Sequence, residues 1–126
     1  MPLSQPSATE LMDAIREHLD EQLRPKLSGK EAYDIRVASN LLAILKRELE
    51  LGPGAAARAQ TRLTKLLELE SGLEELNTAL SDRIRKRELD SSSDDLLAHL
   101  RQTALDKLSI DNPRYSAYLR ARPAQL

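Results

Sequence analysis

The sequence predicts an all-α protein, a single-domain bundle of about five helices with a short C-terminal helical segment. Its 126 residues include no Phe, no Trp and only three Tyr. Val37 is the sole valine, so residues that favour strands are scarce. Leucines recur at three- and four-residue steps along most of the chain, which is the spacing of amphipathic helices. The length suits one domain that buries its own core.

Serines at capping-box spacing predict where several helices begin. In a capping box, a serine and an acidic residue three positions later satisfy each other's free backbone amides. The pairs are Ser7 with Glu10, Ser28 with Glu31, Ser71 with Glu74 and, as a weaker fourth pair, Ser92 with Asp95.

Proline and glycine predict where the first two helices end. The first helix is expected from about Ser7 to Arg24, because Pro25 restricts the residue before it and removes an amide donor. A central helix is expected over Ala32–Leu51, ending at Gly52-Pro53-Gly54. These two helices should form an antiparallel pair.

Three further helices and a short segment complete the predicted bundle. They are expected at about Pro53–Glu70, Leu73–Arg87 and Ser93–Asp111, with the short segment running through Tyr118. The helical domain would then occupy residues 7–119. Residues 1–6 and 120–126 are expected to be a flexible N-terminal tail and a loose C-terminal tail.

The central helix is apolar on two faces and polar on a third. Its apolar stripes are Ile35, Ala38, Leu42, Leu45 and Leu49, and beside them Val37, Leu41, Ile44 and Leu51. A helix this apolar is expected to be wrapped by other helices. Arg36, Asn40 and Arg47 share the remaining side. This polar strip is either an ordinary exposed face or a surface that binds a partner.

A second candidate surface lies near the C-terminus, in Ile110-Asp111-Asn112-Pro113-Arg114-Tyr115. Tyrosine and arginine are favoured anchors of protein interfaces, so Asn112, Arg114 and Tyr115 are candidate partner-binding residues. The alternative is a segment that folds back and uses Tyr115 and Tyr118 to cover the leucine core.

Charge and composition exclude several classes of partner and site. The 19 basic and 20 acidic residues give a net charge of −1, so no global field favours nucleic acid or a membrane surface. No apolar run approaches the length of a membrane span. The absence of cysteine excludes disulfides and thiolate chemistry, and a cytoplasmic location is expected.

We find no constellation of residues typical of catalysis, and expect a chain that is not an enzyme and holds no cofactor. Gly52-Pro53-Gly54 lacks the lysine and serine of a phosphate-binding loop. Asp95 and His99 have the four-residue spacing of metal ligands, but no third ligand is indicated. The basic run Arg83–Arg87 is flanked by acidic residues and has no interleaved aromatic residue, so nucleic-acid binding is not expected.

Three segments resemble a family of short bacterial helical proteins that is itself uncharacterised. They are Pro6-Ser7-Ala8-Thr9-Glu10-Leu11, Arg36-Val37-Ala38-Ser39-Asn40-Leu41-Leu42-Ala43-Ile44 with Arg47-Glu48-Leu49, and Leu108-Ser109-Ile110-Asp111-Asn112-Pro113-Arg114-Tyr115. Genes of that family commonly lie beside an aminoglycoside-phosphotransferase-like kinase and an acyl-CoA dehydrogenase. One member looks like the small accessory subunit of the 4-hydroxyacyl-CoA kinase of levulinate catabolism.

The resemblance implies a kinase partner and an accessory role without catalysis. Arg36, Asn40, Arg47, Asn112 and Arg114 would then bind the kinase together with Tyr115. Alternatively, arginine would reach the phosphates of an acyl-CoA at the shared interface, because its guanidinium makes bidentate contacts. Two rival interpretations stay open: a stand-alone helical module that binds acyl-CoA or another small molecule, and a homo-oligomeric structural protein.

Overall fold

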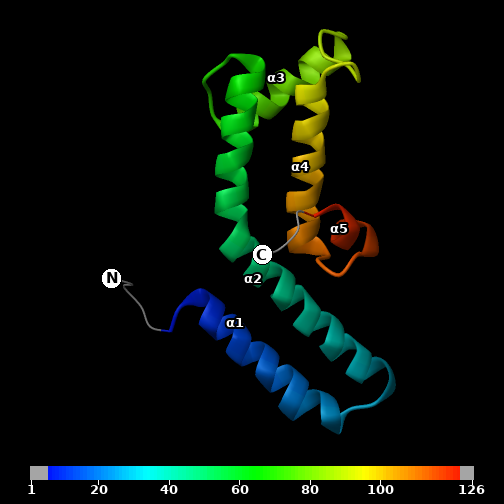
Figure 1. Cartoon of the computed structure of the whole chain (residues 1–126). Coiled ribbons are helices and arrows are strands. Elements are labelled where there is room, and N and C mark those ends of the chain that lie inside the picture. The colour runs from blue at the N-terminus through cyan, green and yellow to red at the C-terminus, as the bar shows by residue number, and fades with distance from the viewer. Residues whose placement is uncertain (1–5, 123–126) are drawn as a thin grey trace. The chain divides into compact units, whose positions relative to one another are not determined.

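The computed structural model describes residues 6–122 and confirms the all-α class. No strand occurs in this part of the chain (Figure 1). The elements are α1 (Ala8–Glu17), a π-helical turn η1 (His18–Leu23), a 3-10 turn η2 (Arg24–Lys26), α2 (Gly29–Leu67), α3 (Leu73–Arg85), α4 (Asp94–Asp111) and α5 (Ser116–Ala121). The chain divides into two compact units, Met1–Leu51 and Gly52–Leu126, and each is described by itself.

The first unit is a helical hairpin built from α1, the two short turns and the first half of α2. The Nζ of Lys46 donates to Asp13 Oδ2 at 2.8 Å, and the Oγ of Ser39 donates to Asp20 Oδ2 at 3.0 Å. Asp20 of η1, the later residue of the first arm, therefore pairs with Ser39, the earlier residue of α2, and Asp13 of α1 pairs with the later Lys46. The predicted antiparallel pair is confirmed.

The first capping box is also confirmed. Ser7 Oγ accepts the amide of Glu10 at 3.3 Å, and Glu10 Oε1 accepts the amide of Ser7 at 3.1 Å. These reciprocal bonds satisfy two amide donors at the start of α1.

The expectation that other helices wrap the central helix is wrong for its outer side. Ser39 and Ala43, with small side chains, are the buried residues of this segment. Val37 is 37% exposed and Leu41 is 56% exposed. The reason is that α1 covers a narrow stripe of α2, and a hairpin of two helices leaves the other stripes uncovered.

The predicted break at Gly52-Pro53-Gly54 is wrong, because α2 runs unbroken from Gly29 to Leu67 with Pro53 inside it. Proline lacks the amide that would donate to the Leu49 carbonyl, but it does not prevent helical torsions on either side. The alanine-rich sequence that follows strongly favours helix and continues it. Helix α2 ends where Glu68 adopts a positive φ of 53°, the left-handed conformation typical of a helix end.

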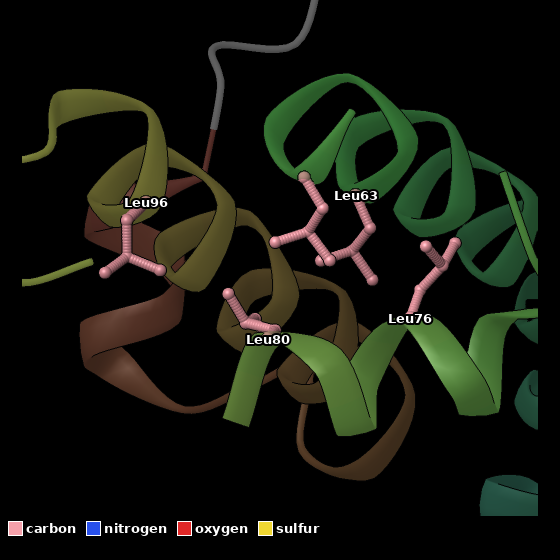
Figure 2. Packing of buried hydrophobic residues seen from close by; sticks show 5 residues of the cluster. Leu63, Leu76, Leu80 and Leu96 are labelled. Carbon is pink, nitrogen blue, oxygen red and sulfur yellow. The ribbon is translucent and has the colours of Figure 1, made fainter. Parts of the chain in front are cut away.

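The second unit holds the main core. It comprises the second half of α2 with α3, α4 and α5. Figure 2 shows Leu63 of α2, Leu76 and Leu80 of α3 and Leu96 of α4 pointing toward one another. Leu67 completes this buried cluster, and Leu66, Leu73, Ala79 and Leu89 pack against it. The core is almost purely leucine, as the composition requires.

Two of the predicted caps in this unit are wrong. The N-cap of α4 is Ser93, whose side chain accepts the amide of Leu96 at 3.1 Å, and not Ser92. The N-cap of α3 is Gly72, without a side-chain hydrogen bond, and not Ser71. In both places the N-cap lies one residue later than the serine pattern indicated.

The C-terminal segment forms α5, which lies against the end of α4. Arg101 Nη2 of α4 donates to the carbonyl of Ala121 at 3.3 Å. The helix thus continues slightly beyond the expected limit at Tyr118. Residues 1–5 and 123–126 of the expected tails lie outside the described residues. None of the helices over residues 6–122 combines the length and apolar character needed to cross a membrane.

Candidate functional site

The hairpin of the first unit exposes large apolar side chains from both of its helices. Leu11 and Ile15 of α1 are 50% and 48% exposed, and Leu45 and Leu49 of α2 are each 51% exposed. We refer to these four residues as the hairpin face.

The four side chains project to the same side of the hairpin. Ile15 precedes Arg16, whose Nε is buried, and Leu45 precedes Lys46, which reaches Asp13 on the opposite helix. On each helix, the side chain one position earlier is rotated by about 100° around the helix axis. Because the two helices are antiparallel, this rotation turns Ile15 and Leu45 toward the same side of the hairpin. Leu11 and Leu49 continue the two rows at four-residue steps. The hairpin face is therefore a continuous apolar surface.

Such a surface is a candidate interaction site. Single exposed leucines are ordinary, whereas apolar side chains grouped across two elements are typical of protein interfaces. Asp13 and Lys46 pair across the hairpin, with their side chains 50% and 28% exposed. The hydrogen bond that the Lys46 ammonium donates to Asp13 raises the pKa of that ammonium.

The predicted polar strip lies on the opposite side of the hairpin. Asn40 follows the buried Ser39, and Arg47 follows Lys46, so both are rotated away from the hairpin face. Arg36 and Asn40 are exposed and Arg47 is half-buried. The structure therefore brings the strip together along one side of α2, as the spacing indicated, and separates it from the apolar face.

The second predicted surface is a turn between α4 and α5. Asn112 ends α4 by donating its amide to the Leu108 carbonyl at 2.8 Å, and its own carbonyl accepts the amide of Tyr115 at 3.1 Å. Arg114 is exposed and the Tyr115 side chain is 48% exposed. The side chain of Tyr118 is half-buried. The turn thus presents Tyr115 outward, and it belongs to the second unit whereas the polar strip belongs to the first.

A feature that the sequence did not predict is a cleft between α4 and the second half of α2. Its volume is about 320 Å³. Residues from both helices line it: Arg62, Lys65, Leu66, Asp95, Ala98, His99 and Gln102. We refer to it as the α2–α4 cleft.

Arg62 and His99 form the centre of this cleft. Arg62 Nε donates to His99 Nδ1 at 3.1 Å, and Arg62 Nη2 donates to Thr103 Oγ1 at 3.3 Å. His99 is 4% exposed, and its burial, with the adjacent Arg62 charge, lowers the pKa of its imidazole. The ring is therefore neutral at neutral pH. Because Nδ1 accepts a hydrogen bond, the ring proton lies on Nε2.

The predicted i, i+4 pair of Asp95 and His99 does line this cleft together. No group of three or more metal-ligating side chains occurs among residues 6–122, and His99 Nδ1 is already engaged by Arg62. The partner that defines the environment of His99 thus comes from another helix. Sequence spacing within α4 gives no signal of that partner.

The fold and these surfaces define the chain as a small all-α domain with an exposed apolar hairpin. A family model described as "Domain of unknown function (DUF6285)" matches residues 25–115. The chain belongs to this DUF6285 family. A search of curated proteins and a search of solved structures each found no match.

Proposed function

We propose that this chain is a non-catalytic accessory subunit that binds an aminoglycoside-phosphotransferase-like kinase. In this proposal the kinase phosphorylates a hydroxyacyl-CoA in short-chain acid catabolism and supplies all of the chemistry. The two proteins would meet in the cytoplasm. The observation that carries the binding role is the hairpin face.

The hairpin face supports this role on energetic grounds. Among the described residues of the first unit, no large apolar side chain is fully buried. Completing the burial of four half-exposed side chains contributes about 1 kcal/mol each, from the 1.5–3 kcal/mol of a whole side chain. A partner that covers this surface would therefore stabilise the hairpin while it gains affinity.

The identity of the partner rests on the resemblance of the three sequence segments. The second and third segments lie within the part of the chain that the DUF6285 family model matches. Arg36 and Asn40 lie on the opposite side of the hairpin from the hairpin face, so in this proposal they would make a separate contact with the kinase. Arg114 and Tyr115 would form a second contact from the other unit.

The test is co-expression with the kinase encoded by the neighbouring gene, followed by size-exclusion chromatography and an ATP-consumption assay on 4-hydroxyacyl-CoA. The critical variant is Leu45→Glu, which places a charge in the hairpin face. The matched control is Leu97→Glu, because Leu97 of α4 is 46% exposed and lies in the other unit. Circular dichroism checks that both variants remain helical.

We expect a stable complex and phosphorylation that depends on this chain. Leu45→Glu should abolish co-elution and Leu97→Glu should preserve it. A kinase that is fully active alone and elutes separately would refute the proposal. Sedimentation of the purified chain at several concentrations tests the rival homo-oligomer, in which the hairpin face would pair with its own copy.

A further inference from the structure

The α2–α4 cleft contains positive charge that the chain does not neutralise. Arg62 donates to two neutral acceptors, an imidazole nitrogen and a hydroxyl. Neither Arg62 nor Lys65 makes an ion pair with any of residues 6–122. Asp95 is the single carboxylate that lines the cleft. Two cations and one carboxylate leave a net charge of +1.

The helices hold these groups in register. Arg62 lies opposite His99, and Arg58, one turn earlier in α2, lies 3.8 Å from Asp106, which is further along α4. The two helices are therefore antiparallel here, and their facing side chains interleave. The positive charge of Arg58 is compensated by Asp106. The positive charges of Arg62 and Lys65, which line the cleft, are not compensated in this way.

The fixed position of Arg62 is unusual for a surface arginine. Exposed arginines normally keep considerable rotamer freedom, which a ligand must restrict at a cost. Here His99 and Thr103 hold the guanidinium by Nε and Nη2, so part of this cost is met in the unliganded protein. The Nη1 group makes no hydrogen bond within residues 6–122.

His99 adds a second kind of donor. Its Nδ1 accepts from Arg62, so its proton is on Nε2, which makes no hydrogen bond to residues 6–122. Because burial keeps the ring neutral, the imidazole brings a donor without a second charge. The cleft thus offers a guanidinium, an ammonium and an imidazole N–H.

We propose that the α2–α4 cleft binds the phosphate group of a small phosphorylated molecule, with Arg62 and Lys65 as its charged ligands. Phosphate presents at least three acceptor oxygens in different directions, which matches donors that come from two helices. A carboxylate presents two oxygens in one plane and matches a single guanidinium. The volume of about 320 Å³ is at the small end of ligand pockets. This site does not depend on the partner-binding role of the hairpin.

The test uses NMR of the full chain, whose two histidines give two ring signals. The probes are inorganic phosphate and glycerol 3-phosphate, added at slightly alkaline pH and constant ionic strength. Sodium acetate and sodium chloride serve as control anions. His18, which is exposed on the first unit, is the internal reference.

We expect the His99 signal to shift saturably with both phosphates while the His18 signal stays in place. Tighter binding of glycerol 3-phosphate would identify a phosphate ester as the ligand, and equal binding would identify the free phosphate group. Lys65→Gln should weaken binding about tenfold, the loss of one charge-assisted hydrogen bond. Arg85→Gln, which removes an exposed cation of α3 that pairs with Asp82, should not.

Three results would overturn the proposal. They are a shift that does not saturate, an equal shift with acetate or chloride, and unchanged binding by Lys65→Gln. Arg62→Gln should abolish phosphate binding. If Arg62→Gln does not fold, Lys65→Gln decides whether the cleft binds phosphate, because Lys65 is exposed and its replacement should leave the fold intact.

Discussion

Two leucine-to-alanine substitutions compare how much the core and the hairpin face contribute to the free energy of unfolding. Leu63 is fully buried at 0% exposure, and Leu45 is 51% exposed. Leu63→Ala removes a side chain that three helices surround and leaves a cavity, at a cost of about 3 to 5 kcal/mol in the free energy of unfolding. Leu45→Ala loses only the contacts of a half-exposed side chain, and should cost about 1 kcal/mol or less.

Urea unfolding followed by circular dichroism measures both costs on the purified chain. The midpoint should fall far more for Leu63→Ala than for Leu45→Ala, with similar slopes. The same Leu45→Ala protein should show weakened binding to the kinase. Equal destabilisation by the two substitutions would refute the reasoning, because Leu45 would then be covered in the free protein and the hairpin face would not be a free surface.

Three further predictions follow from features that the structure revealed. Pro53→Ala should restore an amide donor inside α2 and raise the free energy of unfolding by up to about 3 kcal/mol; an unchanged or lower value in urea would contradict a continuous helix. NMR titration should place the pKa of His99 below the ordinary value for histidine, because burial and the Arg62 charge disfavour the protonated ring. The stability that the neutral ring contributes is present above the unfolded pKa and is lost as pH falls through the folded pKa; an ordinary or raised His99 pKa would contradict its burial. Ser93→Ala should cost about 1 kcal/mol as the loss of an N-cap, whereas Ser71→Ala should be nearly neutral by the same unfolding assay.

The helical class and most helix positions could be predicted because they depend on local pattern. Leucine spacing predicted α3 and α4, and Leu76, Leu80 and Leu96 are buried. It did not give the width of the buried face, since Leu97 and Leu100 of α4 are 46% and 44% exposed. The first capping box could also be predicted, because Ser7 and Glu10 are three residues apart and each side chain accepts the other's backbone amide.

The continuity of α2 could not be predicted from local signals. Proline and two glycines favour a helix end, but the helix-forming sequence on both sides outweighs them. The start of α4 illustrates the same limit, since Ser92 has an acidic residue three positions later, yet the N-cap is Ser93, which has Leu96 at that position.

Neither the hairpin face nor the α2–α4 cleft could be predicted from the sequence as a complete site. The hairpin face includes Ile15 and Leu45, which are distant in sequence. Its side chains are exposed because α1 covers only a narrow stripe of α2. The α2–α4 cleft joins Arg62 to His99 across two helices. Spacing within one helix shows which residues share a side, but it does not show which side a neighbouring helix covers.

Hydrogen–deuterium exchange on the chain alone and in complex with the co-expressed kinase tests the central claim most directly. We predict that the kinase protects α1 and the first half of α2, where no large apolar side chain of the described residues is fully buried, and leaves exchange in α4 unchanged. Protection confined to α3, α4 and α5, or exchange that is the same with and without the kinase, would contradict the hairpin face as the binding surface.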